Sequence, residues 1–121
     1  MSNDPTIIIS IGTPDDPNGP GYLNEDEWLN FRDDLRHEAR ILADGGTLHF
    51  QGEGTGQYVS GGTTYEELSY SVVFTLDDGI PLDQVRRWLS DLARRYRQEC
   101  IALTIGATEF VEAPRCSARR I

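Results

Sequence analysis

The chain has 121 residues, of which 38% are hydrophobic and 26% charged, so it fits one globular domain and is not predicted to be disordered. It carries 20 acidic residues against 11 basic ones, a formal net charge of −9 that would repel a phosphate backbone. We therefore expect no direct binding of nucleic acid. No apolar run approaches the roughly 18 residues of a membrane span, and no signal peptide is recognisable, so we expect no membrane contact and a cytoplasmic location.

The two cysteines form no recognisable metal or redox motif. Cys100 and Cys116 lack the C-x-x-C and Cys/His spacings that zinc sites and dithiol sites require. We interpret both as free thiols in a reducing compartment.

The first predicted strand covers residues 6–12, where β-branched residues are followed by a Gly-Thr-Pro stop. Alternation along a strand places Ile7, Ile9 and Ile11 on one face, which we expect to be the buried one. Residues 14–21 are rich in Pro, Gly and Asp, which predicts a loop.

A first helix is predicted to begin after Asn24. The Asn24 side chain can accept the Glu27 backbone N–H while the Glu27 carboxylate reaches back, as in a capping box. Gly45 and Gly46 supply the C-terminal stop. Helical spacing then predicts a buried stripe of Trp28, Phe31, Leu35 and Leu42.

Two strands are predicted next. In residues 47–51, alternation places Leu48 and Phe50 on the core side and His49 and Gln51 on the other side. Residues 65–76 sustain the period of two for longer than any other part of the chain. Their predicted faces are an apolar row of Leu68, Tyr70, Val72, Phe74 and Leu76, and a polar row of Glu67, Ser69, Ser71, Val73 and Thr75.

A second helix and a last strand complete the pattern. Pro81 suits the start of a helix, and residues 100–105 alternate as a strand. The apolar stripe of this helix is Val85, Trp88, Leu89, Leu92 and Tyr96. The order βαββαβ predicts a ferredoxin-like α+β fold, in which two helices cover one face of a four-stranded antiparallel sheet. We expect one domain over residues 1–111 and a flexible tail over residues 112–121.

The glycines of residues 52–62 raise the possibility of a phosphate-binding loop. Such a loop is followed by a helix, and a P-loop also needs a lysine, whereas here a strand follows and the chain has no Lys. We predict instead the long tip of a β-hairpin, into which Tyr58 and Val59 extend a strand.

The loop before the first helix partly matches a calcium-binding loop. Asp16, Asn18, Gly21 and Glu27 fall at positions 1, 3, 6 and 12 of that template, but Pro20 at position 5 offers no side-chain oxygen. In the alternative interpretation Glu27 is simply a helix cap. We expect no cofactor other than this candidate Ca²⁺.

The sheet face away from the helices is the first candidate binding surface. Its small hydroxyl and apolar side chains could pack against a second copy, line a ligand cleft or simply face solvent. The predicted residues of this open sheet face are His49, Gln51, Ser69, Ser71, Val73, Thr75 and Thr104. His49 could act as a general base, but the sequence identifies no second catalytic group.

Charged and aromatic residues define two further candidate surfaces. The hairpin and its acidic contacts comprise Glu53, Tyr58, Tyr65, Glu66 and Glu67. A basic ridge on the second helix comprises Arg86, Arg94 and Arg97. The ridge could bind an acidic partner or an anionic metabolite, or it could pair with neighbouring acids.

These features predict a non-catalytic binding module that self-associates through its open sheet face and binds a small molecule or a protein. One alternative is an acidic phage-type inhibitor that mimics nucleic acid on a host protein. Another is a small enzyme that uses His49. Dissociation by added salt would separate the electrostatic decoy from a module that holds its ligand in a cavity.

Overall fold

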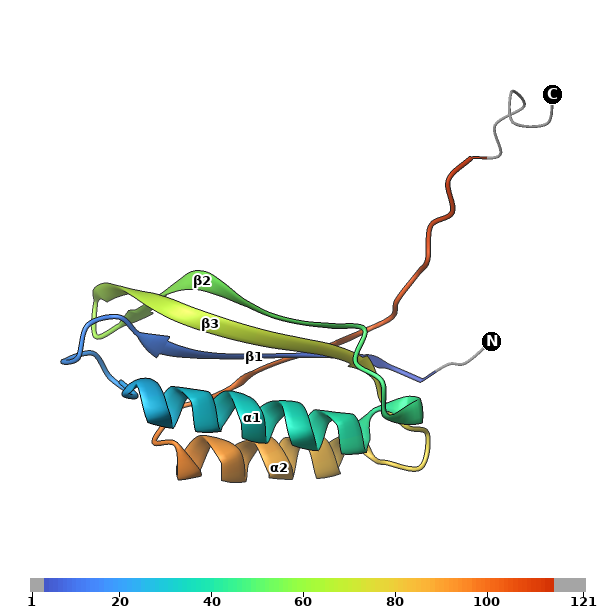
Figure 1. Cartoon of the computed structure of the whole chain (residues 1–121), viewed down its shortest axis with the longest axis horizontal. Coiled ribbons are helices and arrows are strands. Elements are labelled where there is room, and N and C mark those ends of the chain that lie inside the picture. The colour runs from blue at the N-terminus through green and yellow to red at the C-terminus, as the bar shows by residue number, and fades with distance from the viewer. Residues whose placement is uncertain (1–3, 115–121) are drawn as a thin grey trace.

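The computed structural model describes residues 4–114 as two layers, a four-stranded sheet with both helices on one of its faces (Figure 1). In chain order the elements are β1 (Thr6–Pro14), α1 (Glu25–Leu42), the 3-10 turn η1 (Asp44–Gly46), β2 (Phe50–Ser60), β3 (Thr63–Thr75), α2 (Leu82–Arg95) and β4 (Ala102–Gly106). The strand order is β2-β3-β1-β4, and all neighbouring strands are antiparallel. This is the ferredoxin-like α+β fold that the element order predicts.

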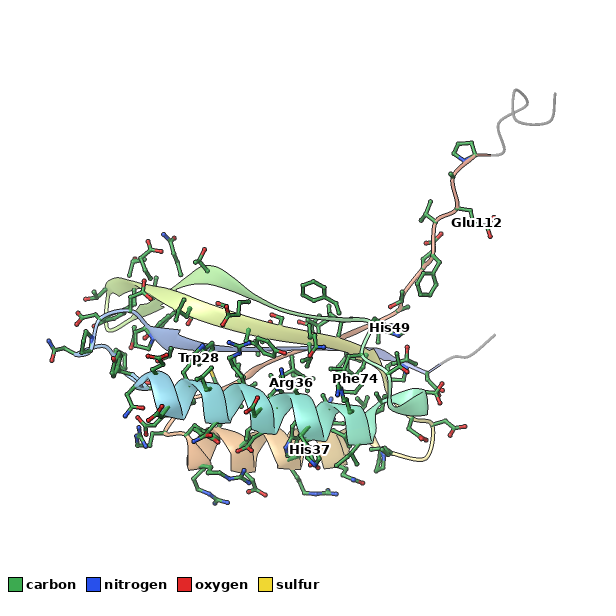
Figure 2. All side chains as sticks on the ribbon, viewed as in Figure 1. Trp28, Arg36, His37, His49, Phe74 and Glu112 are labelled. Carbon is green, nitrogen blue, oxygen red and sulfur yellow. The ribbon has the colours of Figure 1, made fainter. Side chains whose placement is uncertain are left out.

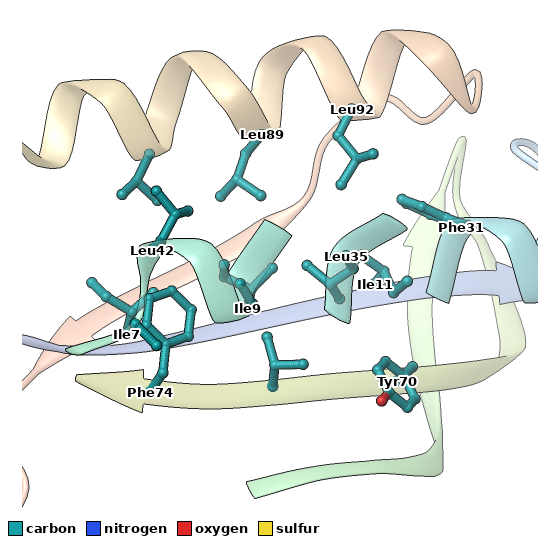
Figure 3. Close-up of a cluster of buried hydrophobic side chains, with 14 of the residues drawn as sticks. Ile7, Ile9, Ile11, Phe31, Leu35, Leu42, Tyr70, Phe74, Leu89 and Leu92 are labelled. Carbon is teal, nitrogen blue, oxygen red and sulfur yellow. The ribbon is translucent and has the colours of Figure 1, made fainter. Parts of the chain in front are cut away.

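The core lies between the central strands and the two helices (Figure 3). β1 and β3 are paired so that Ile7 lies opposite Phe74 and Ile9 opposite Val72, and all four side chains are fully buried. The helices contribute the buried side chains Phe31, Leu35, Leu42, Leu89 and Leu92. The predicted apolar rows of β1 and β3 are therefore confirmed, because each points toward the helix layer.

The predicted start of α1 is also confirmed. The Asn24 side chain accepts the Glu27 N–H at 2.9 Å, and the Glu27 carboxylate accepts the Asn24 N–H at 3.2 Å. This capping box satisfies two backbone donors that the first helical turn would otherwise leave unpaired. The helix ends at Leu42, and Gly45 and Gly46 then adopt positive φ angles of 67° and 69°.

The hairpin between β2 and β3 differs from the prediction of a short strand and a long glycine-rich tip. β2 runs through the glycines to Ser60, and the turn is Gly61–Gly62, with φ angles of 58° and 79°. Two-residue hairpin turns whose twist matches that of the flanking strands require positive φ angles, which glycine adopts without strain. The remaining glycines are strand residues, because β3 is long enough to pair with each of them. The predicted extension of the strand through Tyr58 and Val59 is confirmed.

Within the predicted strand of residues 47–51, Leu48 packs against the core as predicted, but the faces of Phe50 and Gln51 are reversed relative to the prediction. Phe50 pairs with Val73 on the open face and is 55% exposed, so its predicted place in the core is wrong. Gln51 lies on the helix side, where it accepts a hydrogen bond from the buried Tyr70 hydroxyl at 3.0 Å. Gln51 is therefore not part of the open sheet face. Tertiary contacts explain this orientation of β2, because Gln51 and Glu53 find hydrogen-bonding partners on the helix side of the sheet.

The end of α2 removes Arg97 from the predicted basic ridge. Gln98 N–H donates to the Ala93 carbonyl at 2.8 Å and Arg97 N–H donates to the Arg94 carbonyl at 3.2 Å, the two hydrogen bonds of a Schellman motif. Arg97 takes the left-handed conformation at this motif, with a φ of 57°. The helix thus ends at Arg95, and β4 begins at Ala102, two residues after the predicted start.

Residues 107–114 follow β4 without helix or strand and lead away from both layers (Figure 1). Residues 112–114 of the predicted tail are exposed, and residues 115–121, including Cys116, lie outside the described part of the chain. Within residues 4–114, no helix is both long and apolar enough to cross a membrane.

Candidate functional site

A pocket of about 260 Å³ opens at one end of the open sheet face. Three parts of the chain form it, namely the four strands of the sheet, the loop before α1 and the segment that joins α2 to β4. Its lining residues are Ser10, Ile11, Gly12, Pro14, Pro20, Gly21, Tyr58, Glu67, Gln98, Glu99, Cys100 and Ala102.

The Glu67 carboxylate lies on the pocket wall, in a space left by one glycine on each neighbouring strand. In the sheet Glu67 is paired with Pro14 of β1 and Gly56 of β2. A Cβ atom at Gly12 would overlap the Glu67 carboxylate, and one at Gly56 would lie 3.1 Å from its Oε1. The two glycines therefore leave the space that the carboxylate occupies.

The Glu67 carboxylate has an unusual electrostatic environment for an acidic residue. Burial raises the pKa of Glu67, and a hydrogen bond donated by the Ser69 hydroxyl at 3.2 Å partly lowers it again. Among residues 4–114, no arginine forms an ion pair with Glu67. A half-buried carboxylate without a cationic partner favours a positively charged ligand.

Tyr58 forms the side of the pocket next to Glu67. Its ring stacks on that of Tyr65, the opposite residue of the hairpin, with 5.4 Å between the ring centroids and 22° between the ring planes. Its hydroxyl donates to the Pro20 carbonyl at 3.0 Å, which ties the hairpin to the loop before α1. Burial, followed by the nearby charge of Glu67, raises the pKa of Tyr58, so the phenol is neutral at pH 7.

Gln98 connects the remaining wall to the same loop. The left-handed turn at Arg97 directs the Gln98 side chain back toward Gly21, and its Nε2 donates to the carbonyls of Gly21 and Tyr96, both at 2.9 Å. The hairpin and the segment after α2 are thus both joined to the loop before α1 by hydrogen bonds, at the adjacent carbonyls of Pro20 and Gly21.

Comparison with known proteins yields no matching family model and no matching curated protein. Among solved structures, a phage S-adenosylmethionine (SAM) lyase in complex with S-methyl-5′-thioadenosine is similar with a TM-score of 0.58 and 17% identity, over 87% of this chain and 81% of that chain. A phage SAM lyase in its apo state has a TM-score of 0.46 at 14% identity, over 90% of this chain and 93% of that chain. A Bacillus cereus protein related to NIF3 has a TM-score of 0.43 at 15% identity, over 88% of this chain and 26% of that chain. The likeness to the first structure shows a shared fold.

The predicted open-face residues other than Gln51 do share the open sheet face. His49 lies there, with its Nε2 2.8 Å from the Thr75 hydroxyl and its ring edge-on to Phe110. Within residues 4–114 the hydrogen-bonding partner of the His49 ring is thus a hydroxyl and not a carboxylate. The open face also holds a hydrogen bond between the Ser10 and Ser71 hydroxyls at 2.8 Å.

The predicted acidic contacts of the hairpin separate onto two faces. Glu53 forms an ion pair with Arg32 of α1 on the helix side. Glu66 accepts a hydrogen bond from Gln57 Nε2 at 2.7 Å. Of these three acids, Glu67 alone lines the pocket.

The predicted basic ridge is reduced to Arg86 and Arg94. Each pairs with the aspartate three residues earlier on α2, at 3.0 Å and 2.7 Å respectively. Arg97 pairs instead with Glu27 of α1 at 2.7 Å, which places it on the opposite side of the helix end.

The calcium-loop alignment is not reproduced in space. Asp16 accepts the Asn18 backbone N–H at 2.9 Å within a turn, while Glu27 is held by its capping box and by Arg97. The hydrogen bond from Arg97 and that from the Asn24 N–H lower the pKa of Glu27. Among residues 4–114, no three His, Cys, Asp or Glu side chains gather as a metal site would require. The helix-cap interpretation of Glu27 therefore describes this loop.

Three residues that shape the pocket carry no recognisable signal in the sequence. Gly12 ends a predicted strand, Gly56 belongs to a predicted loop, and Gln98 lies near a predicted helix terminus. Two of the predicted hairpin contacts, Tyr58 and Glu67, do line the pocket.

Proposed function

We propose that the Glu67 pocket binds SAM and that the protein cleaves it as a lyase, releasing S-methyl-5′-thioadenosine. The observation that carries this proposal is the half-buried Glu67 carboxylate, which has no arginine partner in the described chain. The fold shared over most of both chains with a phage SAM lyase supports the choice of ligand. The proposal departs from the sequence-based expectation of a non-catalytic module.

The pocket suits both halves of the ligand. SAM carries a positive sulfonium, and a carboxylate in a partly dry site attracts such a charge more strongly than one in water. The ring of Tyr58, supported by its stacking on Tyr65, lines the pocket together with the carboxylate and offers an aromatic surface for a purine or a cation. At about 260 Å³ the pocket is slightly smaller than most ligand sites, so part of the ligand would extend from its mouth.

The charge of the ligand changes during the proposed reaction. The bond between sulfur and the amino-acid chain breaks, its electron pair stays on sulfur, and the product is a neutral thioether. The departing carbon unit completes its valence by closing on its own carboxylate or by losing a proton, so no further reactant is required. Glu67 therefore contributes to substrate affinity and loses its attraction for the product, while rate enhancement depends on how the pocket orients the substrate.

The test is formation of S-methyl-5′-thioadenosine by the purified chain, measured by mass spectrometry against the spontaneous decay of SAM in buffer. We expect Glu67→Gln to lower kcat/KM by about tenfold or more, the loss of one charge interaction. Glu66→Gln is the matched control, because that carboxylate pairs with Gln57 outside the pocket. A wild-type rate equal to that of buffer, or equal rates for the two variants, would contradict the proposal.

A non-catalytic module that self-associates through the open sheet face is the second candidate. Phe50 favours it, since this aromatic side chain lies 55% exposed on that face. If this candidate holds, Phe50→Ser weakens self-association in sedimentation experiments and the chain leaves SAM intact. The acidic-inhibitor alternative stays a prediction that a salt titration of a captured host protein would check.

A further inference from the structure

A second hollow, of about 540 Å³, lies between α2 and the free edge of β4. We call it the α2–β4 groove. Its lining residues are Arg86, Leu89, Ser90, Ala93, Arg94, Gln98, Glu99, Cys100, Ile101 and Leu103. It shares three residues with the Glu67 pocket but opens on the edge of the sheet rather than on its open face.

The floor of the α2–β4 groove is apolar and one side is an unpaired strand. Leu89, Ala93 and Leu103 are the apolar side chains that the two elements contribute to it. β4 stands at the end of the strand order and pairs with β1 alone in the described chain. Its outer edge therefore presents backbone N–H and C=O groups to which an extended segment can bind.

The rim of the α2–β4 groove is basic on its α2 side, whereas Glu99 lies on the segment that leads to β4. Arg86 and Arg94 line it, and both belong to ion pairs in which every side chain is at least 54% exposed. Ion pairs this exposed contribute little stability, so either arginine can turn to a new acidic partner at small cost. The α2–β4 groove thus combines an apolar floor, a free strand edge and a basic rim.

The segment after β4 has the complementary character. Phe110 and Val111 are 79% and 83% exposed, and Glu109 and Glu112 flank them. Figure 2 shows Glu112 well away from both layers. We call residues 107–114 the C-terminal arm. Its apolar and acidic side chains match the floor and the rim of the α2–β4 groove.

The arm of one chain leads away from the groove of the same chain. The Thr108 hydroxyl contacts that of Thr6 on β1, and Phe110 lies edge-on to His49, whose partner Thr75 is on β3. The arm therefore crosses the end of the sheet from β4 over β1 toward β3. The free edge of β4 is on the opposite side, so a second copy is the occupant that the arm can reach.

We propose that the C-terminal arm of one copy adds as a strand to β4 of a second copy, in the α2–β4 groove. In an extended arm Glu109 and Val111 share one face. When that face is turned toward α2, Val111 packs on the apolar floor and Glu109 reaches Arg86 or Arg94. This surface is distinct from the open sheet face and does not depend on the proposed lyase activity.

Sedimentation equilibrium of the full chain tests the proposal. We expect wild-type protein to self-associate, and Val111→Ser to raise the dissociation constant by about tenfold or more. Val111 is 83% exposed, so this variant should fold normally. Val59→Ser is the matched control, because Val59 is 68% exposed on β2, the strand at the opposite edge of the sheet from β4. A monomeric wild type at millimolar concentration, or equal effects of Val111→Ser and the control, would overturn the proposal.

Charge reversal tests which surface receives the arm. Arg94→Glu should weaken self-association, and adding Glu109→Arg to it should restore part of the loss through the exchanged pair. Phe50→Ser, on the open sheet face, should leave it unchanged. If Phe50→Ser dissociates the oligomer while Arg94→Glu does not, the open sheet face is the interface and the arm is not.

Discussion

Gly12 and Glu67 lie on adjacent strands, and the carboxylate of Glu67 occupies the space that a Cβ atom on Gly12 would need. This relationship places the carboxylate beside β1, inside the pocket, and no arginine of residues 4–114 forms an ion pair with it. A side chain introduced at Gly12 would therefore displace the carboxylate without changing its charge.

Gly12→Ala should therefore lower the affinity for SAM by about tenfold. The conflict is with the flexible end of a side chain, so the carboxylate moves aside and the strand stays intact. The free energy of unfolding in denaturant should therefore change little, whereas calorimetric titration with SAM should show the loss of affinity. Gly54→Ala is the control, since a Cβ there meets nothing within 4 Å. Equal affinities in the two variants would show that the position of the carboxylate is unimportant.

Glu67 should reduce the stability of the protein at neutral pH. Because burial raises its pKa in the folded state, protonated Glu67 favours folding, and this contribution is lost as the pH rises through the folded-state pKa. Glu67→Gln should then melt at a higher temperature than wild type at pH 7, and the difference should shrink as the pH falls below 4.5. Thermal melts of Glu66→Gln over the same range provide the baseline. A melting temperature of Glu67→Gln below that of wild type at pH 7 would refute this assignment.

The same raised pKa predicts a pH dependence of activity. Protonation removes the negative charge that attracts the sulfonium, so kcat/KM for SAM should fall as the pH drops through the pKa of Glu67, above its ordinary 4.5. Inhibition by S-methyl-5′-thioadenosine, which is neutral at sulfur, should hardly change over that range. A parallel decline of both quantities would point to loss of structure instead.

Tyr96 should limit stability at alkaline pH. Its ring stacks on Phe31 with 4.4 Å between centroids, its hydroxyl donates to Asp34, and burial together with that hydrogen bond raises the pKa of Tyr96 to about 12. The raised pKa means that the folded state retains the proton, so this stabilisation is complete below pH 10 and is lost as the pH approaches 12. Tyr96→Phe should lose less stability over that interval in denaturant titrations. A steeper alkaline loss in Tyr96→Phe would contradict this account.

The sequence predicts the fold because the buried rows of β1 and β3 follow a strict period of two. Ile9 and Val72 could be placed on the helix face from alternation alone. The same argument fails at Phe50 and Gln51, because Gln51 is held by Tyr70 of the adjacent strand, a contact that periodicity does not describe. Local pattern thus determines the strands whose two faces differ in polarity, and tertiary partners determine the polar edge strand.

The candidate site is less accessible to sequence reasoning than the fold. Glu67 could be singled out as an acid on β3, but its role depends on the absence of side chains at Gly12 and Gly56. Gln98 joins the site through the left-handed turn at Arg97 that follows α2, where no glycine marks the end of the helix. Each of these features is created by distant segments that meet only in the folded chain.

A crystal structure of the protein grown with S-methyl-5′-thioadenosine tests the location of the proposed site most directly. The account predicts the nucleoside beside Tyr58, with its sulfur toward the Glu67 carboxylate. A nucleoside bound elsewhere, or a pocket that stays empty at saturating ligand, would contradict it.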